Sequence, residues 1–376
     1  MAVSIDLARR RLLALSAGAA TAAALAPRRL HAAQPLASLK DAAQRIGLRY
    51  GSAEDAIIEH SPQPYRALFA QQCALYAANL SWKWMAPTPD ADDPVREDPN
   101  LPFAYANGMA ITGAHLVWHE GIPAWAGQLT EAGQLEAAIR RHIDAMARRY
   151  AGKVYSWNVV NEGLDPGEGR PDGMRNTAFL KILGPKYMDF AFRAARQANV
   201  APLLVYNDYN MEMDKPLHEM RRRALLRLLE SFRRDGTPID AVGLQSHLRL
   251  DGSTFDETIY RTFLGEIAAM GFKIMITELD VLDLDTPSDI AARDKAVAEL
   301  YRRFLAVALD QTAVISVVSW GLSDRYTWLT AQRSASYARP DGMPARPLPF
   351  DDWYQPKPAY HALLAAFTGA PRRKAV

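Results

Sequence analysis

The sequence predicts a single-domain α/β fold, the (β/α)₈ barrel. Three observations support this prediction. Short segments rich in Val, Ile and Leu alternate with longer amphipathic segments about eight times within residues 34–376. No glycine-rich dinucleotide motif or phosphate-binding loop occurs, which disfavours an open doubly wound sheet. Carboxylates and aromatic residues end several of the short segments, and a closed barrel would gather them on one rim.

The short apolar segments are expected to be buried strands because they are too short for helices and rich in β-branched residues. Residues 37–53 read as a short helix leading into the first strand, where Gly51 permits close packing. The expected strands lie at residues 49–53, 74–80, 110–118, 154–161, 203–206, 241–247, 273–277 and 314–320. Apolar residues three or four apart predict helices between them, the clearest at 134–150, 186–199, 218–236 and 293–310.

Composition limits the possible functions. The chain has 376 residues, of which 49% are apolar and 23% charged, enough for one large core. The net charge is +2 with both signs mixed along the chain, so no nucleic-acid partner is expected. Cys73 is the only cysteine, which excludes an internal disulfide, and we expect its thiol to be buried and unreactive. We expect no metal, no cofactor and a monomeric protein.

The first 33 residues have the pattern of an export signal. Arg9, Arg10 and Arg11 precede an alanine-rich apolar run at residues 12–26, and small residues suited to cleavage follow. Consecutive arginines before a mildly apolar core are typical of the twin-arginine type. The run is too short and too alanine-rich for a convincing membrane span. The alternative is a frayed amphipathic helix. If the signal is real, residues 34–376 form the catalytic domain and act in the periplasm or outside the cell.

Two carboxylates stand at the carboxyl ends of expected strands. Glu162 follows the strand at 154–161, and Glu278 follows the strand at 273–277. Two such acids on a barrel rim, with aromatic faces for sugar rings, are the groups that glycosidic hydrolysis requires. Each residue alone is as easily explained as a helix cap or a core residue. Other polar and aromatic residues at strand ends are Trp118, His119, Asn161, Asn207, Asp208, Gln245, His247, Asp280, Trp320 and Asp324.

The sequence also resembles glycoside hydrolase family 10, whose characterised members are mostly endo-1,4-β-xylanases. Five motifs in family order carry the resemblance, which covers nearly all of residues 34–376. They are WNVVNE at 157–162 for the family's WDVVNE, YNDYN at 206–210, GLQSH at 243–247, ITELD at 276–280 and WGLSDRYTW at 320–328 for the family's WGxSDxxSW.

The resemblance implies a retaining enzyme that cleaves β-1,4-type linkages in a xylan-like or substituted polysaccharide, with Glu162 as acid/base and Glu278 as nucleophile. The implied substrate-binding residues are Lys83, Trp84, Trp118, His119, Asn161, Tyr209, Gln245, His247, Trp320 and Trp328. Glu278 must stay ionised, and we expect hydrogen bonds from His247 and Gln245 to favour that state. Asp280 is expected to orient His247, and Asn161 to contact the sugar's 2-hydroxyl.

Departures from the family pattern cluster on the glycone side of the expected site. Asn79 and Leu80 replace a Glu-Asn pair, Ala114 replaces a histidine and Gly121 replaces a glutamine. Asn158 also replaces an aspartate of the family pattern, so His119 has an amide where a carboxylate partner is expected. His115 should point away from the family histidine because a strand alternates its faces. In another interpretation His115 or Glu120 supplies replacement contacts.

A deleted hydrogen bond to a sugar hydroxyl costs ~1 to 3 kcal/mol, so we expect weak action on plain xylan. The alternatives left open are a hydrolase of a bacterial exopolysaccharide and a carbohydrate-binding homologue with little turnover. The sequence does not distinguish endo from exo action.

Overall fold

The computed structural model describes residues 36–89, 97–199, 201–330 and 332–374. The expected export signal, residues 1–33, lies outside these ranges. Residues 37–376 cluster as one compact unit. None of the helices in the described ranges has the length and apolar character needed to cross a bilayer.

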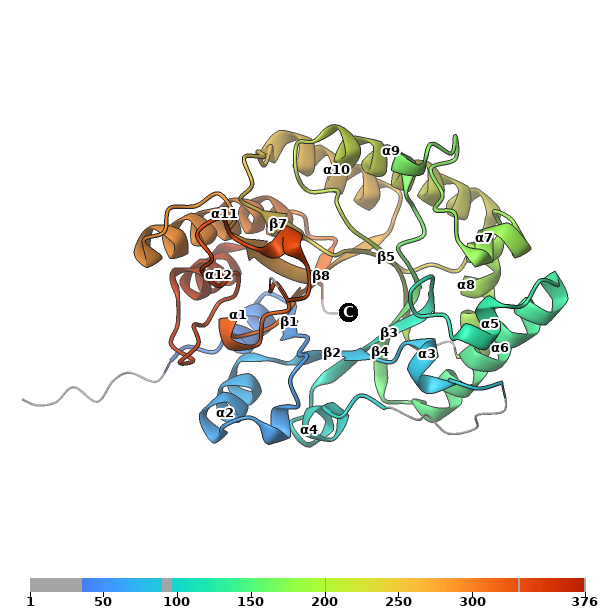
Figure 1. Ribbon diagram of the computed structural model, residues 1–376, viewed down its shortest axis with the longest axis horizontal. Coiled ribbons are helices and arrows are strands. Elements are labelled where there is room, and N and C mark those ends of the chain that lie inside the picture. The colour runs from blue at the N-terminus through green and yellow to red at the C-terminus, as the bar shows by residue number, and fades with distance from the viewer. Residues whose placement is uncertain (1–35, 90–96, 200, 331, 375–376) are drawn as a thin grey trace, which may run out of the picture. The chain divides into compact units, whose positions relative to one another are not determined.

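Eight parallel strands form a closed ring, which confirms the predicted single-domain (β/α)₈ barrel. From β1 to β6 each strand pairs with the next along the chain. β6 and the short β7 both pair with β8, β8 pairs with β9, and β9 returns to β1. In Figure 1 the helices lie outside this ring. The strands are β1 Arg49–Ser52, β2 Leu75–Asn79, β3 Ala110–Trp118, β4 Val154–Asn161, β5 Leu203–Asp208, β6 Ala241–Leu244, β7 His247–Arg249, β8 Lys273–Leu282 and β9 Val314–Ser319.

The helices follow from the periodicity of the sequence. In α6, Leu135, Ile139 and Ile143 recur every four residues and are buried against the barrel. Side-chain caps fix several helix starts, as where Asp256 accepts hydrogen bonds from the first turn of α10. The α-helices are α1 Leu39–Arg45, α2 Gln63–Gln72, α3 Trp82–Met85, α4 Leu101–Ala106, α5 Ala124–Gly127, α6 Ala132–Arg149, α7 Ala178–Leu183, α8 Tyr187–Ala198, α9 Pro216–Asp235, α10 Glu257–Ala269, α11 Ile290–Asp310 and α12 Pro358–Gly369.

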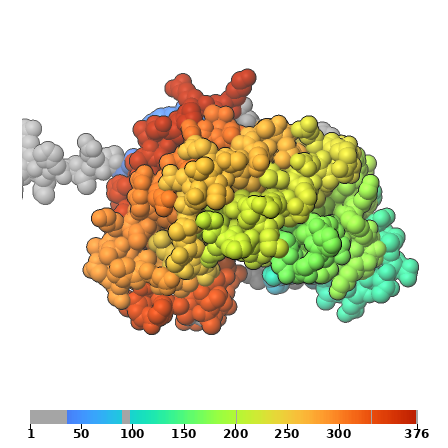
Figure 2. All heavy atoms as spheres, turned by 90° about the horizontal axis from the view of Figure 1, so that it is seen from above, coloured from blue at the N-terminus to red at the C-terminus, as the bar shows by residue number. Residues whose placement is uncertain are grey.

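Short 3₁₀ turns occupy the loops at η1 Ile58–His60, η2 Pro166–Glu168, η3 Asp324–Tyr326 and η4 Ala335–Tyr337. Figure 2 shows the side of the barrel that α9, α10 and α11 cover, in yellow and orange.

Polar contacts close the ring between its first and last strands. The Tyr50 hydroxyl lies 2.9 Å from the Ser319 hydroxyl, and the Ser52 hydroxyl donates to the Ser319 carbonyl at 3.0 Å. A Cβ at Gly51 would lie 1.8 Å from the Leu75 carbonyl oxygen, so only glycine fits between β1 and β2. The expected close packing at Gly51 is therefore present.

The sixth and seventh strands of the barrel differ from the prediction. Residues 241–247 were expected to form one strand, but β6 ends at Leu244 and β7 begins at His247. Ser246 between them has φ +64°, which interrupts regular pairing. β8 continues to Leu282, beyond the predicted end at 277, because β7 pairs with its outer half.

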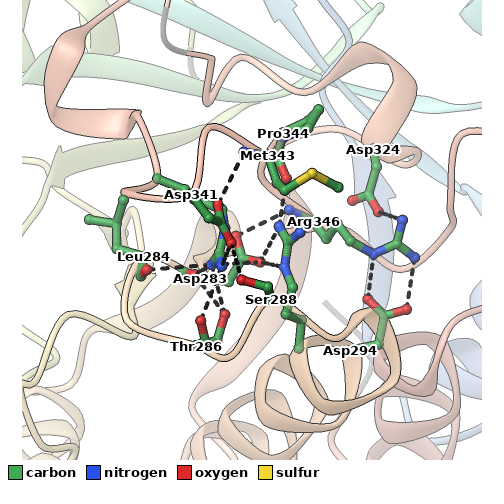
Figure 3. A network of polar contacts seen from close by, with 12 residues as sticks. Asp283, Leu284, Thr286, Ser288, Asp294, Asp324, Asp341, Met343, Pro344 and Arg346 are labelled. Atoms are coloured by element: carbon green, nitrogen blue, oxygen red, sulfur yellow. Dashed lines mark hydrogen bonds and ion pairs between the residues drawn. The ribbon is translucent and has the colours of Figure 1, made fainter.

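A network of buried ion pairs fixes the loop between β9 and α12, described at residues 320–330 and 332–357 (Figure 3). Asp283, just after β8, pairs with Arg293 of α11 at 2.7 Å, and both side chains are at most 1% exposed. Arg346 makes two hydrogen bonds to Asp294 at 2.8 and 2.7 Å, and Lys357 pairs with Asp324 at 2.8 Å. Arg346 thus ties the loop to α11, and Arg339, whose guanidinium lies 3.6 Å from the Asp283 carboxylate, ties it to the end of β8.

Candidate active site

A cavity of about 390 Å³ opens at the carboxyl ends of the strands. Loops and strand ends from β3 to β9 supply its walls, and both Glu162 and Glu278 line it. The other residues that line the cavity are His115, Trp118, Glu120, Asn161, Tyr209, Asn210, Gln245, His247, Leu248, Arg249, Asp280, Leu282, Trp320, Trp328, Leu329, Arg333 and Tyr337.

Glu162 directly follows β4 in an unusual backbone conformation. Its φ is +55°, in the left-handed region that residues other than glycine rarely adopt. The Glu162 amide donates to the Asn207 carbonyl at 2.8 Å, and Arg175 donates to the Glu162 carbonyl at 2.9 Å. The surrounding structure therefore holds the strained residue in place, as is common where a side chain must be aimed.

Two neutral N–H groups hold the Glu162 carboxylate. The Trp118 indole donates to Oε2 at 3.0 Å, and the Gln245 amide donates to Oε1 at 3.0 Å. The expectation that Gln245 contacts Glu278 is therefore wrong. β6 ends at Leu244 and Ser246 has φ +64°, so Gln245 and His247 do not lie on one continuous strand and contact different acids.

Glu278 lies in β8 and is only 7% exposed. The Asn207 amide donates to its Oε1 at 2.9 Å, and His247 Nε2 lies 3.1 Å from its Oε2. Asn207 also donates to Asn161 Oδ1 at 2.9 Å and accepts from the Thr277 hydroxyl at 2.7 Å. Sequence reasoning placed Asn207 at a strand end but gave it no role, although its position on the same rim was a usable signal.

His247 lies between two carboxylates. Its Nδ1 is 3.0 Å from Asp280 Oδ1, and the Trp328 indole donates to Asp280 Oδ2 at 2.7 Å. Burial acts to lower the pKa of His247, but the charges and hydrogen bonds of Asp280 and Glu278 outweigh it and raise the pKa to about 10. His247 is therefore an imidazolium at neutral pH, with one N–H directed at each acid.

His115 lines the cavity with Trp118, and Glu120 lines it too, whereas Ala114 does not. This is the position that the alternative interpretation, a replacement contact, requires. Between Ala114 and Val117, β3 has one more residue than the paired segment of β4, and this bulge breaks the alternation of faces. The His115 ring centroid lies 4.7 Å from that of Trp118. Burial lowers the pKa of His115 to about 4, so the imidazole is neutral.

Three of the predicted substrate-binding residues, Lys83, Trp84 and His119, do not line this cavity. Lys83 donates to the Glu120 carbonyl at 2.9 Å, and its ammonium lies 5.2 Å from the Trp84 ring centroid. His119 Nδ1 is buried and has no hydrogen-bond partner among the described residues. Asn158, which replaces the carboxylate expected to partner His119, donates its amide hydrogen to Asn161 Oδ1 at 3.2 Å.

The four departing residues on the glycone side also lie outside the cavity lining, which comes from the described residues alone. The Asn79 carboxamide oxygen accepts from the Ser81 hydroxyl at 2.8 Å, and Leu80 is fully buried. Ala114 is 7% exposed, and a Cβ at Gly121 would lie 3.1 Å from the Trp118 ring. None of these positions offers a polar group to the cavity.

Tyr209, Trp320 and Trp328 provide aromatic walls. Arg175 donates to the Tyr209 hydroxyl at 2.7 Å, and the Trp320 ring meets His247 edge-on at 6.3 Å. Sequence reasoning did not find Arg249, Arg333 or Tyr337, which lie in segments with no recognised motif. Within the described ranges, no group of three or more His, Cys, Asp and Glu side chains is placed to hold a metal ion.

Comparisons with known proteins agree with this geometry. Residues 38–366 match the family model described as Glycosyl hydrolase family 10. Endo-1,4-beta-xylanase B of Paenibacillus barcinonensis is 31% identical over 71% of this chain and 80% of its own length. Endo-1,4-beta-xylanase A of Thermotoga neapolitana is 32% identical, but the chain spans only 24% of that relative's length. The endo-1,4-beta-xylanase XylE of Penicillium canescens superposes with a TM-score of 0.77 at 26% identity, covering 89% of this chain and 98% of that one.

Proposed function

Since the chain belongs to glycosyl hydrolase family 10, we propose that it hydrolyses β-1,4 linkages of a xylan-like or substituted polysaccharide with retention of configuration. Glu162 is the acid/base and Glu278 the nucleophile. The relatives are named endo-1,4-beta-xylanases, which supports the linkage type. No cofactor takes part in this proposal.

The observation that carries the proposal is the unequal hydrogen bonding of the two acids. Neutral donors hold Glu162, whereas the imidazolium of His247 faces Glu278. The N–H of a cation directed at Glu278 fits the acid that attacks the sugar, because the attacking oxygen carries negative charge. The two neutral donors to Glu162 are compatible with a carboxyl group that gains and loses a proton during the cycle.

The reaction then follows in two displacements. Glu278 attacks the anomeric carbon while Glu162 gives its proton to the leaving oxygen, which forms a covalent glycosyl-enzyme. Glu162, now ionised, removes a proton from water, and the hydroxide attacks the same carbon and releases Glu278. In this proposal Asn161 donates from its amide nitrogen to the sugar's 2-hydroxyl, since its oxygen already accepts from Asn158 and Asn207. Trp118, Tyr209, Trp320 and Trp328 offer faces for stacking.

Two variants test the assignment on a substrate with a good leaving group, an aryl β-xylobioside, and on an unactivated oligosaccharide. Glu278→Ala should lose nearly all turnover on both. Glu162→Ala should lose far more on the unactivated substrate, because an activated aryl group leaves without protonation. Glu299→Ala, a change of a half-exposed acid on α11, is the matched control. Equal losses on both substrates for Glu162→Ala would reassign the acid.

The second candidate is a carbohydrate-binding homologue with little turnover. It is favoured because none of the residues at positions 79, 80, 114 and 121 brings a polar group to the cavity, as far as the described lining extends. Hydrolysis of the aryl β-xylobioside by the wild-type protein would exclude it. Binding of oligosaccharides without any hydrolysis would support it over the hydrolase.

We further propose that residues 1–33 direct export, so that the enzyme acts in the periplasm or is secreted. The support is the sequence pattern of consecutive arginines and an alanine-rich apolar run. We also propose that the enzyme acts as a monomer on its polysaccharide substrate.

A further inference from the structure

One end of the catalytic cavity carries two arginines. We name it the cationic end and define it by Arg249, Trp328, Arg333 and Tyr337, all of which line the cavity. Arg249 and His247 are two residues apart on β7, so their side chains share a face. At about 3.3 Å per residue, Arg249 lies roughly 7 Å beyond His247 along the strand. The cationic end therefore begins directly beyond the imidazolium that faces Glu278.

Arg249 is held with its terminal nitrogens available. Its Nε donates to Asp251 Oδ2 at 3.0 Å. Asp251 is fixed in turn by Lys215 at 3.0 Å and by the Ser253 hydroxyl at 2.6 Å. No described residue accepts a hydrogen bond from Nη1 or Nη2 of Arg249, and 29% of the side chain is exposed. The guanidinium is thus positioned by one edge while the other edge can bind a ligand.

Arg333 lies against Trp328, with its guanidinium carbon 5.1 Å from the ring centroid. Its ion pair with Asp55 at 3.1 Å joins side chains that are 56% and 62% exposed, so the pair contributes little energy and a ligand can replace it. The Tyr337 ring centroid is also 5.1 Å from that of Trp328. Burial raises the pKa of the Tyr337 hydroxyl, while Arg249 and Arg333 both act to lower it, so both cations lie near this hydroxyl.

The two ends of the cavity differ in charge. Glu162, Glu278 and Asp280 lie at the catalytic end, and Asp280 is occupied by His247 and Trp328. A negatively charged sugar would be repelled there. At the cationic end, two cations with unused N–H donors border an aromatic face on which a sugar ring can stack.

We propose that the cationic end binds a carboxylate carried by a sugar of the substrate, so that the enzyme prefers an acidic β-linked glycan to a neutral one. This inference rests on the proposed hydrolase function. Arginine binds carboxylates through paired N–H groups, and such charge-assisted bonds are stronger than neutral ones. A hydrogen bond to a charged group corresponds to a preference of roughly 10- to 100-fold.

The test compares two substrates that differ only in charge. One is a xylo-oligosaccharide with a single glucuronic acid side group, and the other is the same compound after reduction of the carboxyl to a hydroxymethyl. We expect kcat/KM for the acidic substrate to exceed that for the reduced one by roughly tenfold or more. The ratio should fall toward one in Arg249→Met and in Arg333→Met, mainly through KM, and should fall as NaCl is raised.

Arg302→Met, a change of an exposed arginine on α11 that is paired with Glu299, should leave the ratio unchanged. A wild-type ratio near one would overturn the inference, as would a high ratio that survives both cavity variants. These outcomes leave the proposed function intact as long as the reduced substrate and an aryl β-xylobioside are hydrolysed. If neither the charged nor the uncharged substrates are hydrolysed, the result contradicts the proposed hydrolase function itself.

Discussion

Replacing Asp280 by Asn should lower the pKa of His247 and shift the pH range in which this histidine stabilises the fold. The pKa of His247 is raised from 6.5 to about 10, and its side chain is 19% exposed. At about 1.4 kcal/mol for each pH unit, this net shift corresponds to roughly 5 kcal/mol, which is what Asp280 and Glu278 together supply beyond the opposing effect of burial. Removing the charge of Asp280 should lower the pKa of His247 by roughly two pH units, which corresponds to a cost of about 3 kcal/mol.

The direction of the pH effect follows from the raised pKa. Protonated His247 stabilises the wild-type protein fully below pH 6.5, and this contribution is lost as the pH rises toward 10. In Asp280→Asn this stabilisation by protonated His247 should be lost at a pH roughly two units lower than in the wild type. The difference in the free energy of unfolding between the two proteins should therefore be largest near pH 6 and shrink at alkaline pH.

Two measurements check this expectation. NMR titration of the imidazole reports the pKa of His247 directly, and urea unfolding at pH 6, 8 and 9.5 reports the stability. Asp310→Asn, which removes an exposed carboxylate paired with Arg261, is the matched control and should show neither change. An unaltered titration of His247 in Asp280→Asn would refute the view that Asp280 holds its proton.

Three further predictions concern substrate, stability and export. Turnover of linear, unsubstituted xylan should stay below ~10 s⁻¹ in a reducing-sugar assay, because positions 79, 80, 114 and 121 offer the described cavity no polar group; faster turnover at ordinary affinity would contradict this. Arg293→Met should lower the free energy of unfolding by roughly 3 kcal/mol in urea, because it removes the nearer of the two arginines that pair with buried Asp283, whereas Arg302→Met at an exposed pair should cost under ~1 kcal/mol. Changing Arg9, Arg10 and Arg11 to Lys should block the appearance of folded enzyme outside the cytoplasm, and unchanged export would point to the general secretory route.

Much of the fold was predictable because the signals are local. A strand buried on both faces reads as a short apolar run, so β3 and β4 begin and end where the sequence predicted. Helices such as α6 carry their own periodicity. The rim position of Glu162 and Glu278 follows from the same reasoning, since each acid ends or follows such a run.

Side-chain directions were less predictable because local irregularities decide them. β3 has a bulge, and His115 and Trp118, three residues apart on it, both line the cavity. After the break at Leu244, Gln245 donates to Glu162 and not to Glu278. One extra residue in a strand moves the side chains that follow it to the opposite face of the sheet, and the sequence has no strong signal for such a bulge. Arg333 and Tyr337 belong to a loop without periodicity, whose conformation depends on the ion pairs of Arg339 with Asp283, just after β8, and of Arg346 with Asp294 of α11.

The pairing of β1 with β9 has a consequence for how the chain folds as it is made. Arg49 pairs in register with Ser316, so the barrel cannot close until more than five-sixths of the chain has been synthesised. At about 5 to 20 residues per second, β1 waits roughly 10 to 60 s for its last partner. During that time its outer edge exposes unpaired backbone groups, which are a template for association with other chains. Overproduction of this protein should therefore give more soluble enzyme when synthesis is slow and nascent-chain chaperones are abundant, and fragments that stop before β9 should aggregate.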